Sequence, residues 1–181
     1  TDPEGVILRA GDGGRLAFLR NPDDSYTAIG GAPFTFEEVT GGYELRRLDR
    51  TGYRFDENGR LDAVLARSDL EMELAYDGSG HLDWFADAAG RTATVTTDGD
   101  GLVTRIDLPD GRHVDYAYDG LGRLTGVTDL SGNTLTYELD RRGRILRILD
   151  TSQATLLQNI HDGQGRVIRQ VDGAGGVTDL S

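Results

Sequence analysis

The sequence predicts an all-β repeat protein, a tandem array of hairpin units of about 21 residues. Six glycines stand 21, 21, 21, 21 and 22 residues apart, each with an Asp three positions before it and an aliphatic residue two positions after it. The segments between them alternate apolar and polar residues. A fixed period of this size indicates units that must stack on their neighbours, because none can bury its own apolar face.

The repeated motif predicts a hairpin turn in every unit, as in Tyr118-Asp119-Gly120-Leu121-Gly122-Arg123-Leu124. An Asp at the first position of a type I turn can accept backbone N–H hydrogen bonds, and a Gly at the fourth adopts a left-handed conformation without steric cost. This combination is typical of a turn followed by a G1 bulge. We therefore assign structural turn roles to Asp56, Gly59, Asp77, Gly80, Asp98, Gly101, Asp119, Gly122, Asp140, Gly143, Asp162 and Gly165.

The residues before these turns predict strands with one wet face. Segments 71–76, 113–118 and 134–139 place apolar residues at every second position, which is the period of a half-buried strand. A second strand follows each turn and ends near a second turn signal ten residues past the glycine, at Gly90, Gly111, Gly132 and Gly175. Each unit is thus two strands and two turns. The longer last interval predicts a bulge or a longer turn within 151–160.

Two regions differ in how clearly they repeat. Residues 51–181 hold about six units, whereas residues 1–50 carry only a degenerate form of the pattern. We expect an irregular β lead-in over 1–50, which could cap the array, and no helix anywhere, since no segment combines caps with a 3.6-residue period.

Composition excludes several classes of function. The 19 basic residues are all Arg, and 31 acidic residues leave a net charge of −12, so we expect no nucleic-acid partner. No Cys is present, which excludes disulfides and thiolate chemistry. No apolar run is long enough to cross a bilayer, so we expect no membrane insertion. The chain opens without an initiator Met or a signal sequence, from which we expect a fragment of a longer protein.

Few residues suggest catalysis or metal binding. Asp98-Gly99-Asp100-Gly101 is similar to the start of a calcium loop, but the twelfth position of that loop would be Pro109 instead of Glu. His81, His113 and His161 lie in different repeats, so no short His spacing suggests a zinc site. The sequence contains neither a Gly-x-Ser-x-Gly nucleophile elbow nor a phosphate-binding loop. We expect no catalytic residue, no cofactor and no metal. Trp84 is a possible carbohydrate contact if its ring is exposed.

The Arg that follows the glycine in four units admits two interpretations, an anion clamp or a structural ladder beside the repeated Asp. The ladder is favoured, because His81 and Leu102 replace this Arg without disturbing the period. Such a ladder would cover apolar surface with its methylene stems. The four residues are Arg60, Arg123, Arg144 and Arg166.

The motif resembles the YD repeat of the Rhs (rearrangement hot spot) family, whose pattern is Tyr-Asp-x-x-Gly-Arg-Leu-Thr. Residues 118–125 carry it in full, and Leu139-Asp140-Arg141-Arg142-Gly143-Arg144-Ile145 carries it in part. Thr97 and His161 replace the Tyr.

The likeness covers residues 51–181, and residues 1–50 resemble the lead-in of bacterial Rhs polymorphic toxins. The resemblance implies a continuous antiparallel sheet that curves and spirals into a hollow shell around a C-terminal toxin or effector domain. Related proteins are wall-associated proteins, insecticidal toxin complex cocoons and teneurins.

Two functions therefore compete at the sequence level. The first is a non-enzymatic wall segment whose partners are the rest of the shell and its C-terminal effector domain. The second is a cell-surface module that binds polysaccharide or mediates adhesion. An enzyme with a carboxylate pair is a third and weaker hypothesis. The resemblance alone places the protein outside the cell or at its surface, and open sheet edges predict self-association.

Overall fold

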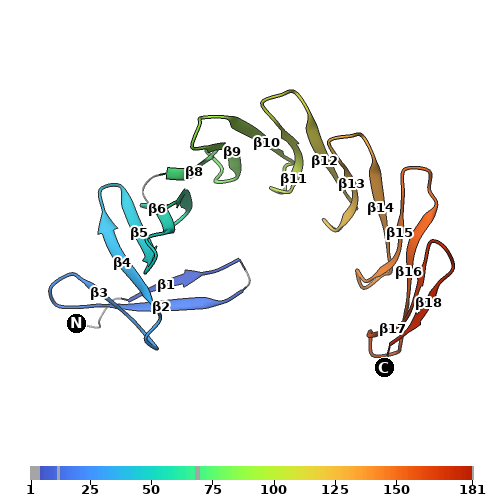
Figure 1. The fold of residues 1–181 in the computed structure, drawn as a ribbon, viewed down its shortest axis with the longest axis horizontal. Coiled ribbons are helices and arrows are strands. Elements are labelled where there is room, and N and C mark those ends of the chain that lie inside the picture. Colours follow the sequence, from blue (N-terminus) through green and yellow to red (C-terminus); the bar gives the residue numbers. More distant parts are fainter. Residues whose placement is uncertain (1–4, 12, 68–69, 181) are drawn as a thin grey trace. The chain divides into compact units, whose positions relative to one another are not determined.

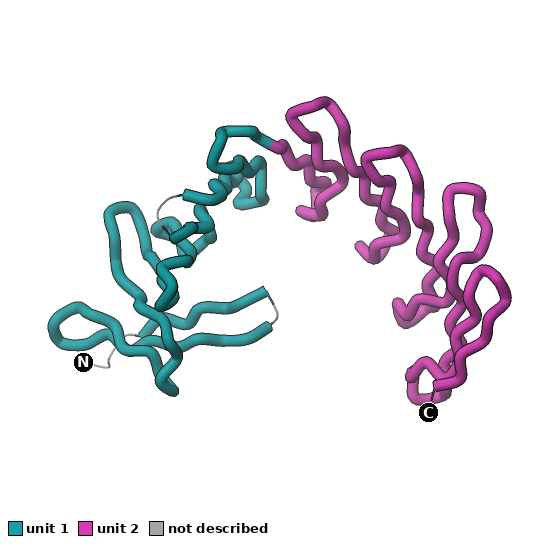
Figure 2. Tube along the Cα trace, in the orientation of Figure 1, with its two compact units in different colours: residues 1–92 teal, residues 93–181 magenta. Residues whose placement is uncertain are grey.

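A computed structural model of the chain describes residues 5–11, 13–67 and 70–180, which form eighteen strands and no helix (Figure 1). The predicted all-β fold is confirmed. Within the described residues, no helix is long and apolar enough to span a membrane. The chain divides into two compact units, residues 1–92 and 93–181 (Figure 2).

Unit 1 contains two sets of antiparallel strands. The first three strands form a small sheet of their own, in the order β1-β2-β3, and the large sheet begins at β4. The strands of this unit are β1 (Gly5–Arg9), β2 (Arg15–Arg20), β3 (Tyr26–Ala28), β4 (Phe34–Val39), β5 (Gly42–Arg47), β6 (Gly52–Asp56), β7 (Leu61–Leu65), β8 (Leu70–Tyr76) and β9 (Leu82–Asp87).

Unit 2 continues the same succession of hairpins. Strand order in the 15-stranded large sheet follows the sequence from β4 to β18. The strands of this unit are β10 (Thr92–Thr97), β11 (Val103–Asp107), β12 (His113–Tyr118), β13 (Leu124–Thr128), β14 (Thr134–Leu139), β15 (Ile145–Leu149), β16 (Thr155–His161), β17 (Val167–Asp172) and β18 (Val177–Asp179).

Register places the alternating apolar residues in rows across the strands. In unit 2, Val127 lies opposite Tyr116 on one side and Leu135 on the other. Ile148 lies in the same way between Tyr137 and Leu157. Because successive side chains of a strand point to opposite faces, each row lies on one face of the sheet. We call this the apolar face.

The irregularity predicted within 151–160 is a β-bulge at Leu156. Ile148 pairs with Leu157 and Leu149 pairs with Thr155, so Leu156 is the extra residue on β16. The turn before it keeps the ordinary length, since the Asp150 N–H donates to the Ala154 carbonyl. The extra residue of the last interval is therefore absorbed in the strand, and the prediction is confirmed.

The apolar face of unit 1 is covered at its beginning by the small sheet. Phe18 of β2 stacks on Phe36 of β4, with ring centroids 5.0 Å apart, and Phe36 stacks on Tyr43 of β5 at 5.6 Å. Tyr26 of β3 meets Phe36 edge-on. Phe18, Phe36 and Leu45 are almost fully buried and form the core of the unit. The degenerate lead-in thus supplies a second layer.

Unit 2 is built differently, since its strands form a single layer. Its buried apolar side chains are Ala93, Val95 and Leu149, and most of the apolar face is half-buried by neighbouring strands. Each hairpin therefore depends on the hairpins beside it for most of its apolar burial.

Candidate functional site: the stacked turns

The six predicted Asp and Gly pairs form six turns of the same geometry. In each, the Gly N–H donates to the carbonyl of the Asp at 2.9 to 3.1 Å, and the Asp N–H donates to the carbonyl of the residue after the Gly. All six glycines have φ between 71° and 92°. This region is costly for any residue with a Cβ, which is why each turn of this set has Gly at its fourth position.

The Asp side chain holds each turn from inside. One carboxylate oxygen of Asp119 accepts the N–H groups of Leu121 and Arg123, at 2.9 and 3.1 Å. The other accepts the Arg123 Nε–H at 2.7 Å. The hydrogen bond from the Arg123 side chain, followed by the backbone bonds, lowers the pKa of Asp119 to about 2. The backbone N–H and side chain of Arg144 likewise lower the pKa of Asp140 to about 2.

The Arg that follows the Gly also lies against the next turn of this set at Arg60, Arg123 and Arg144. A Cβ on Gly143 would lie 3.4 Å from Arg123 Cδ, and one on Gly165 would lie 3.2 Å from Arg144 Nη1. Arg123 Nη1 donates to the Asp140 carbonyl at 2.9 Å. Arg123 therefore bridges its own Asp and the following turn by hydrogen bonds, and Arg60 and Arg144 lie against their following turns, in the manner of a ladder.

The first turn of unit 2 shows which part of this contact is essential. Leu102 stands in the place of Arg, and its Cδ1 would lie 3.3 Å from a Cβ on Gly122. Asp98 still accepts the N–H groups of Asp100 and Leu102. An apolar stem against the next glycine is therefore enough for stacking. The Asp98-Gly99-Asp100-Gly101 segment is an ordinary turn of this set.

Where a Tyr precedes the Asp, its side chain contacts the preceding 21-residue repeat. The Tyr118 hydroxyl donates to the Val103 carbonyl at 2.8 Å, and the Tyr76 hydroxyl donates to the equivalent Leu61 carbonyl at 2.7 Å. The Arg60 guanidinium also lies over the Tyr76 ring, 4.9 Å from its centroid. In these two cases, adjacent 21-residue repeats are joined by a Tyr from one repeat and an Arg or Leu from the other.

His161 stands where the pattern has Tyr, and another residue makes the contact. The Asn159 amide donates to the Ile145 carbonyl at 3.1 Å, the position that matches Leu61 and Val103. The Nδ1 atom of His161 is buried and has no hydrogen-bond partner within the described part of the chain. The hydrogen bond between units survives the loss of the Tyr.

Sequence reasoning missed that the turns at the other end of the hairpins use the same chemistry. One carboxylate oxygen of Asp129 accepts the N–H groups of Ser131 and Asn133 at 2.8 and 2.9 Å. The signal was available, since the same Asp-x-x-Gly spacing ends at Gly90, Gly132 and Gly175. In the turn of Asp150, the left-handed position is occupied by Gln153 with φ 65°. The capping residues of these turns are Asp87, Asp129, Asp150 and Asp172.

Other sequence candidates do not converge on a site. Trp84 lies on β9 opposite Ala75 and is half-buried. His81 and His113 approach single carboxylates, those of Asp77 and Asp115. Over residues 5–11, 13–67 and 70–180, no three His, Asp or Glu side chains are grouped so that they could hold a metal ion. The stacked turns are therefore the candidate functional feature.

Tyr118→Phe tests the hydrogen bond between adjacent 21-residue repeats. We expect the variant to lose about 0.5–1.5 kcal/mol of unfolding free energy, because the Val103 carbonyl loses its hydroxyl donor. Tyr116→Phe is the matched control, since no hydrogen bond joins the Tyr116 hydroxyl to another described residue. Urea unfolding of the two variants measures the difference. Equal stabilities would contradict the role of the Tyr118 hydroxyl.

Comparison with known proteins identifies one repeat directly. The family described as RHS Repeat matches residues 98–134, the stretch that holds the Asp98 and Asp119 turns. These residues are an RHS repeat, and the resemblance to the Rhs/YD-repeat family is confirmed. No curated protein matches the chain.

Solved structures share the fold at low sequence identity. The crystal structure of TcdB2-TccC3-TEV is 14% identical, with a TM-score of 0.55 over 98% of this chain and 10% of that chain. TcdB2-TccC3-Cdc42 is 12% identical, with a TM-score of 0.54 over 93% and 10%. TcdB2-TccC3 without its hypervariable C-terminal region gives the same identity, score and shares. The chain spans about a tenth of the chains it matches, and the likeness concerns the fold.

Proposed function

We propose that this chain, with its RHS repeat at residues 98–134, is a segment of a protein shell and has a structural, non-enzymatic role. The observation that carries the proposal is the use of the repeated residues. Asp119 caps its own turn, Arg123 contacts the next turn, and Tyr118 bonds to the previous unit. The repeated residues therefore hold each hairpin against its neighbours, and a continuous shell wall requires such contacts between successive hairpins.

The cargo of such a shell would be a C-terminal toxin or effector domain of the parent protein, enclosed or displayed by the wall. One of the structures similar in fold is that of TcdB2-TccC3 lacking a hypervariable C-terminal region. A hypervariable C-terminal region in a protein of similar fold supports the proposed C-terminal cargo here. The partners would then be the remaining repeats of the shell and the effector domain, and the family resemblance supports a location outside the cell or at its surface.

The distribution of carboxylates supports a structural role. A catalytic carboxylate pair needs oxygens that face a substrate, whereas Asp56 and Asp140 use their oxygens on backbone N–H groups and an Arg side chain of the same turn. The carbohydrate alternative depends on an exposed ring at Trp84. That ring is half-buried, and no observation favours the alternative.

Protease protection in the parent protein tests the wall. We expect the C-terminal domain to resist cleavage in the parent and to be cleaved when Gly122→Val and Gly143→Val together disrupt two adjacent turns. Gly120→Ala is the matched control, because a Cβ there meets nothing within 4 Å and the φ is ordinary. Cleavage at equal rates in all three proteins would contradict enclosure by this segment.

Self-association of the 181-residue chain is expected through the β18 edge. Within the described residues, β18 pairs with β17 alone, and Val177–Asp179 are exposed. The net charge of −12 opposes association, and salt weakens this repulsion as the Debye length falls from about 30 Å at 0.01 M to about 3 Å at 1 M. Association should therefore grow with salt, as measured by light scattering.

Val177→Pro provides the control for this prediction. The Asp172 N–H donates to the Gly176 carbonyl, and bonded pairs alternate along an antiparallel ladder, so the Val177 N–H points away from β17. Pro at this position removes an outward donor and leaves the ladder intact. We expect this variant to remain monomeric at high salt. A monomeric parent chain under the same conditions would contradict association through this edge.

A further inference from the structure

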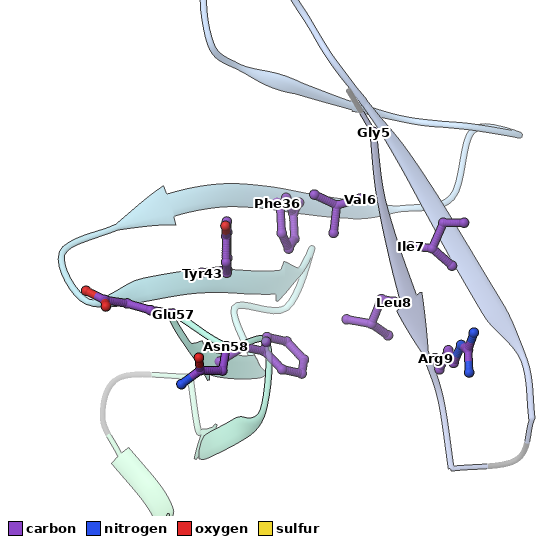
Figure 3. Close-up of a pocket in the computed structure, with 11 residues that line it drawn as sticks. Gly5, Val6, Ile7, Leu8, Arg9, Phe36, Tyr43, Glu57 and Asn58 are labelled. Carbon is purple, nitrogen blue, oxygen red and sulfur yellow. The ribbon is translucent and has the colours of Figure 1, made fainter. Parts of the chain in front are cut away.

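A groove runs beside the edge strand β1 in unit 1 (Figure 3). It has a volume of about 500 Å³ and lies between β1 and the apolar face of the large sheet. Phe36, Tyr43 and Phe55 line it from that face, and Val6 and Leu8 line it from β1. The groove therefore combines an aromatic floor with a strand edge along one side.

The edge of β1 presents unused backbone groups to this groove. Within the described residues of unit 1, β1 pairs with β2 alone. The Ala10 N–H donates to the Gly14 carbonyl, and the register continues without a shift from Arg9 opposite Arg15 to Gly5 opposite Leu19. Because bonded pairs alternate, the N–H and carbonyl groups of Ile7 and Arg9 point away from β2. They are spaced as a further antiparallel or parallel strand requires.

A second pocket continues the groove around the tip of the hairpin. It has a volume of about 490 Å³ and shares Leu8, Arg9 and Phe55 with the first. Its lining is mostly apolar, with Arg9, Arg15 and Arg47 among the polar residues. Arg9 and Arg15 are exposed and form no ion pair within the described residues. These two Arg place positive charge beside an apolar groove in a chain of net charge −12.

We propose that this groove binds an extended segment of another protein, which adds to β1 as a fourth strand of the small sheet. This proposal goes beyond the wall function and does not depend on it. A strand beside β1 would lie at the ~4.8 Å spacing of a sheet and would extend the layer that already packs on Phe36. Alternate side chains of the segment would face Tyr43 and Phe55, as in other cases of strand addition.

The chemistry of the groove specifies the segment. The floor requires apolar side chains at every second position, and the edge requires free N–H groups on the segment. Arg9 and Arg15 favour carboxylates, which Arg binds through paired N–H donors. Glu57 also lines the groove and disfavours carboxylates near it, so the expected partner is a segment of alternating apolar and polar residues, with no Pro and with its carboxylates beside Arg9 and Arg15.

The probe is a fluorescein-labelled peptide, Glu-Val-Thr-Val-Glu-Val-Thr-Val, titrated with the whole chain and followed by fluorescence anisotropy. All proteins carry Val177→Pro, so that the β18 edge does not compete. We expect saturable binding that Ile7→Pro weakens at least about ten-fold, since the variant lacks one outward donor. Ile7→Thr keeps that donor and should bind within about two-fold of the parent. Arg9→Gln with Arg15→Gln should weaken binding and reduce its salt dependence.

A second measurement keeps the test independent of how the variants fold. The same peptide with N-methyl groups on all of its backbone amides cannot donate to a strand edge, and we expect it to lose binding to the parent chain. Equal binding of both peptides, equal binding by Ile7→Pro, or no binding at about 1 mM peptide would overturn the proposal. Dimerisation of the Val177→Pro chain that Ile7→Pro abolishes would instead assign the groove to a second copy and overturn it as stated.

Discussion

Replacement of Gly122 by Val is expected to lower the free energy of unfolding by more than about 1 kcal/mol. The backbone of Gly122 has φ 71°, where a β-branched residue is strained by about 1–2 kcal/mol. A Cβ would also lie 3.3 Å from Leu102 Cδ1, so the stem of the neighbouring turn would have to move. Chemical denaturation followed by circular dichroism measures the loss.

The same turn supplies two controls. Gly120 has an ordinary φ, and a Cβ there meets nothing within 4 Å, so Gly120→Ala should be neutral or slightly stabilising. Leu121 is 76% exposed, so Leu121→Ala should cost much less than Gly122→Val. A loss of equal size in all three variants would contradict the left-handed turn.

Acid is expected to unfold the array between about pH 4 and pH 2. The pKa values of Asp119 and Asp140 fall to about 2 in the folded chain, from an ordinary value of 3.8. The unfolded chain then binds protons more readily, so this stability is present above about pH 4 and is lost as pH falls through about 2. The pKa is lowered as well in the turns of Asp56, Asp77, Asp87, Asp129, Asp150 and Asp162.

Melting temperature as a function of pH measures this loss, and Asp119→Asn separates it from general repulsion among the 19 Arg. The Asn oxygen still accepts the turn N–H groups but does not titrate. We therefore expect the variant to be less stable than the parent at pH 7 and to lose less stability between about pH 4 and pH 2. A parent chain whose melting temperature stays constant across this range would refute the assignment.

The turns were predictable because their determinants are local. An Asp and a Gly three residues apart specify the hydrogen bonds of Asp119 and the φ of Gly122 without help from distant residues. The bulge at Leu156 was predictable for a related reason, since one extra residue in a fixed period must be placed between two turns. The capping role of Asp129 is equally local, because the same Asp and Gly spacing is present at Asp129 and Gly132.

Contacts that depend on register were not predictable. Asn159 makes the hydrogen bond that a Tyr makes in other repeats. This contact depends on the bulge that precedes Asn159 in β16, since the bulge places the amide beside the Ile145 carbonyl. The second layer in unit 1 depends on Phe18 meeting Phe36 across two sheets. Neither residue belongs to a repeated pattern, so no period indicated that they would meet.

Hydrogen bonds from one hairpin to both of its neighbours favour changes of chain length by whole repeats. Tyr118 reaches back while Arg123 reaches forward, so a hairpin that carries both residues offers complementary surfaces to its predecessor and its successor. Loss or duplication of one whole 21-residue period would join surfaces that already match and would keep each side chain on its face. A change of half a period would set unlike turns against each other. The length of such an array can therefore change by whole periods while the contacts between neighbouring hairpins are kept.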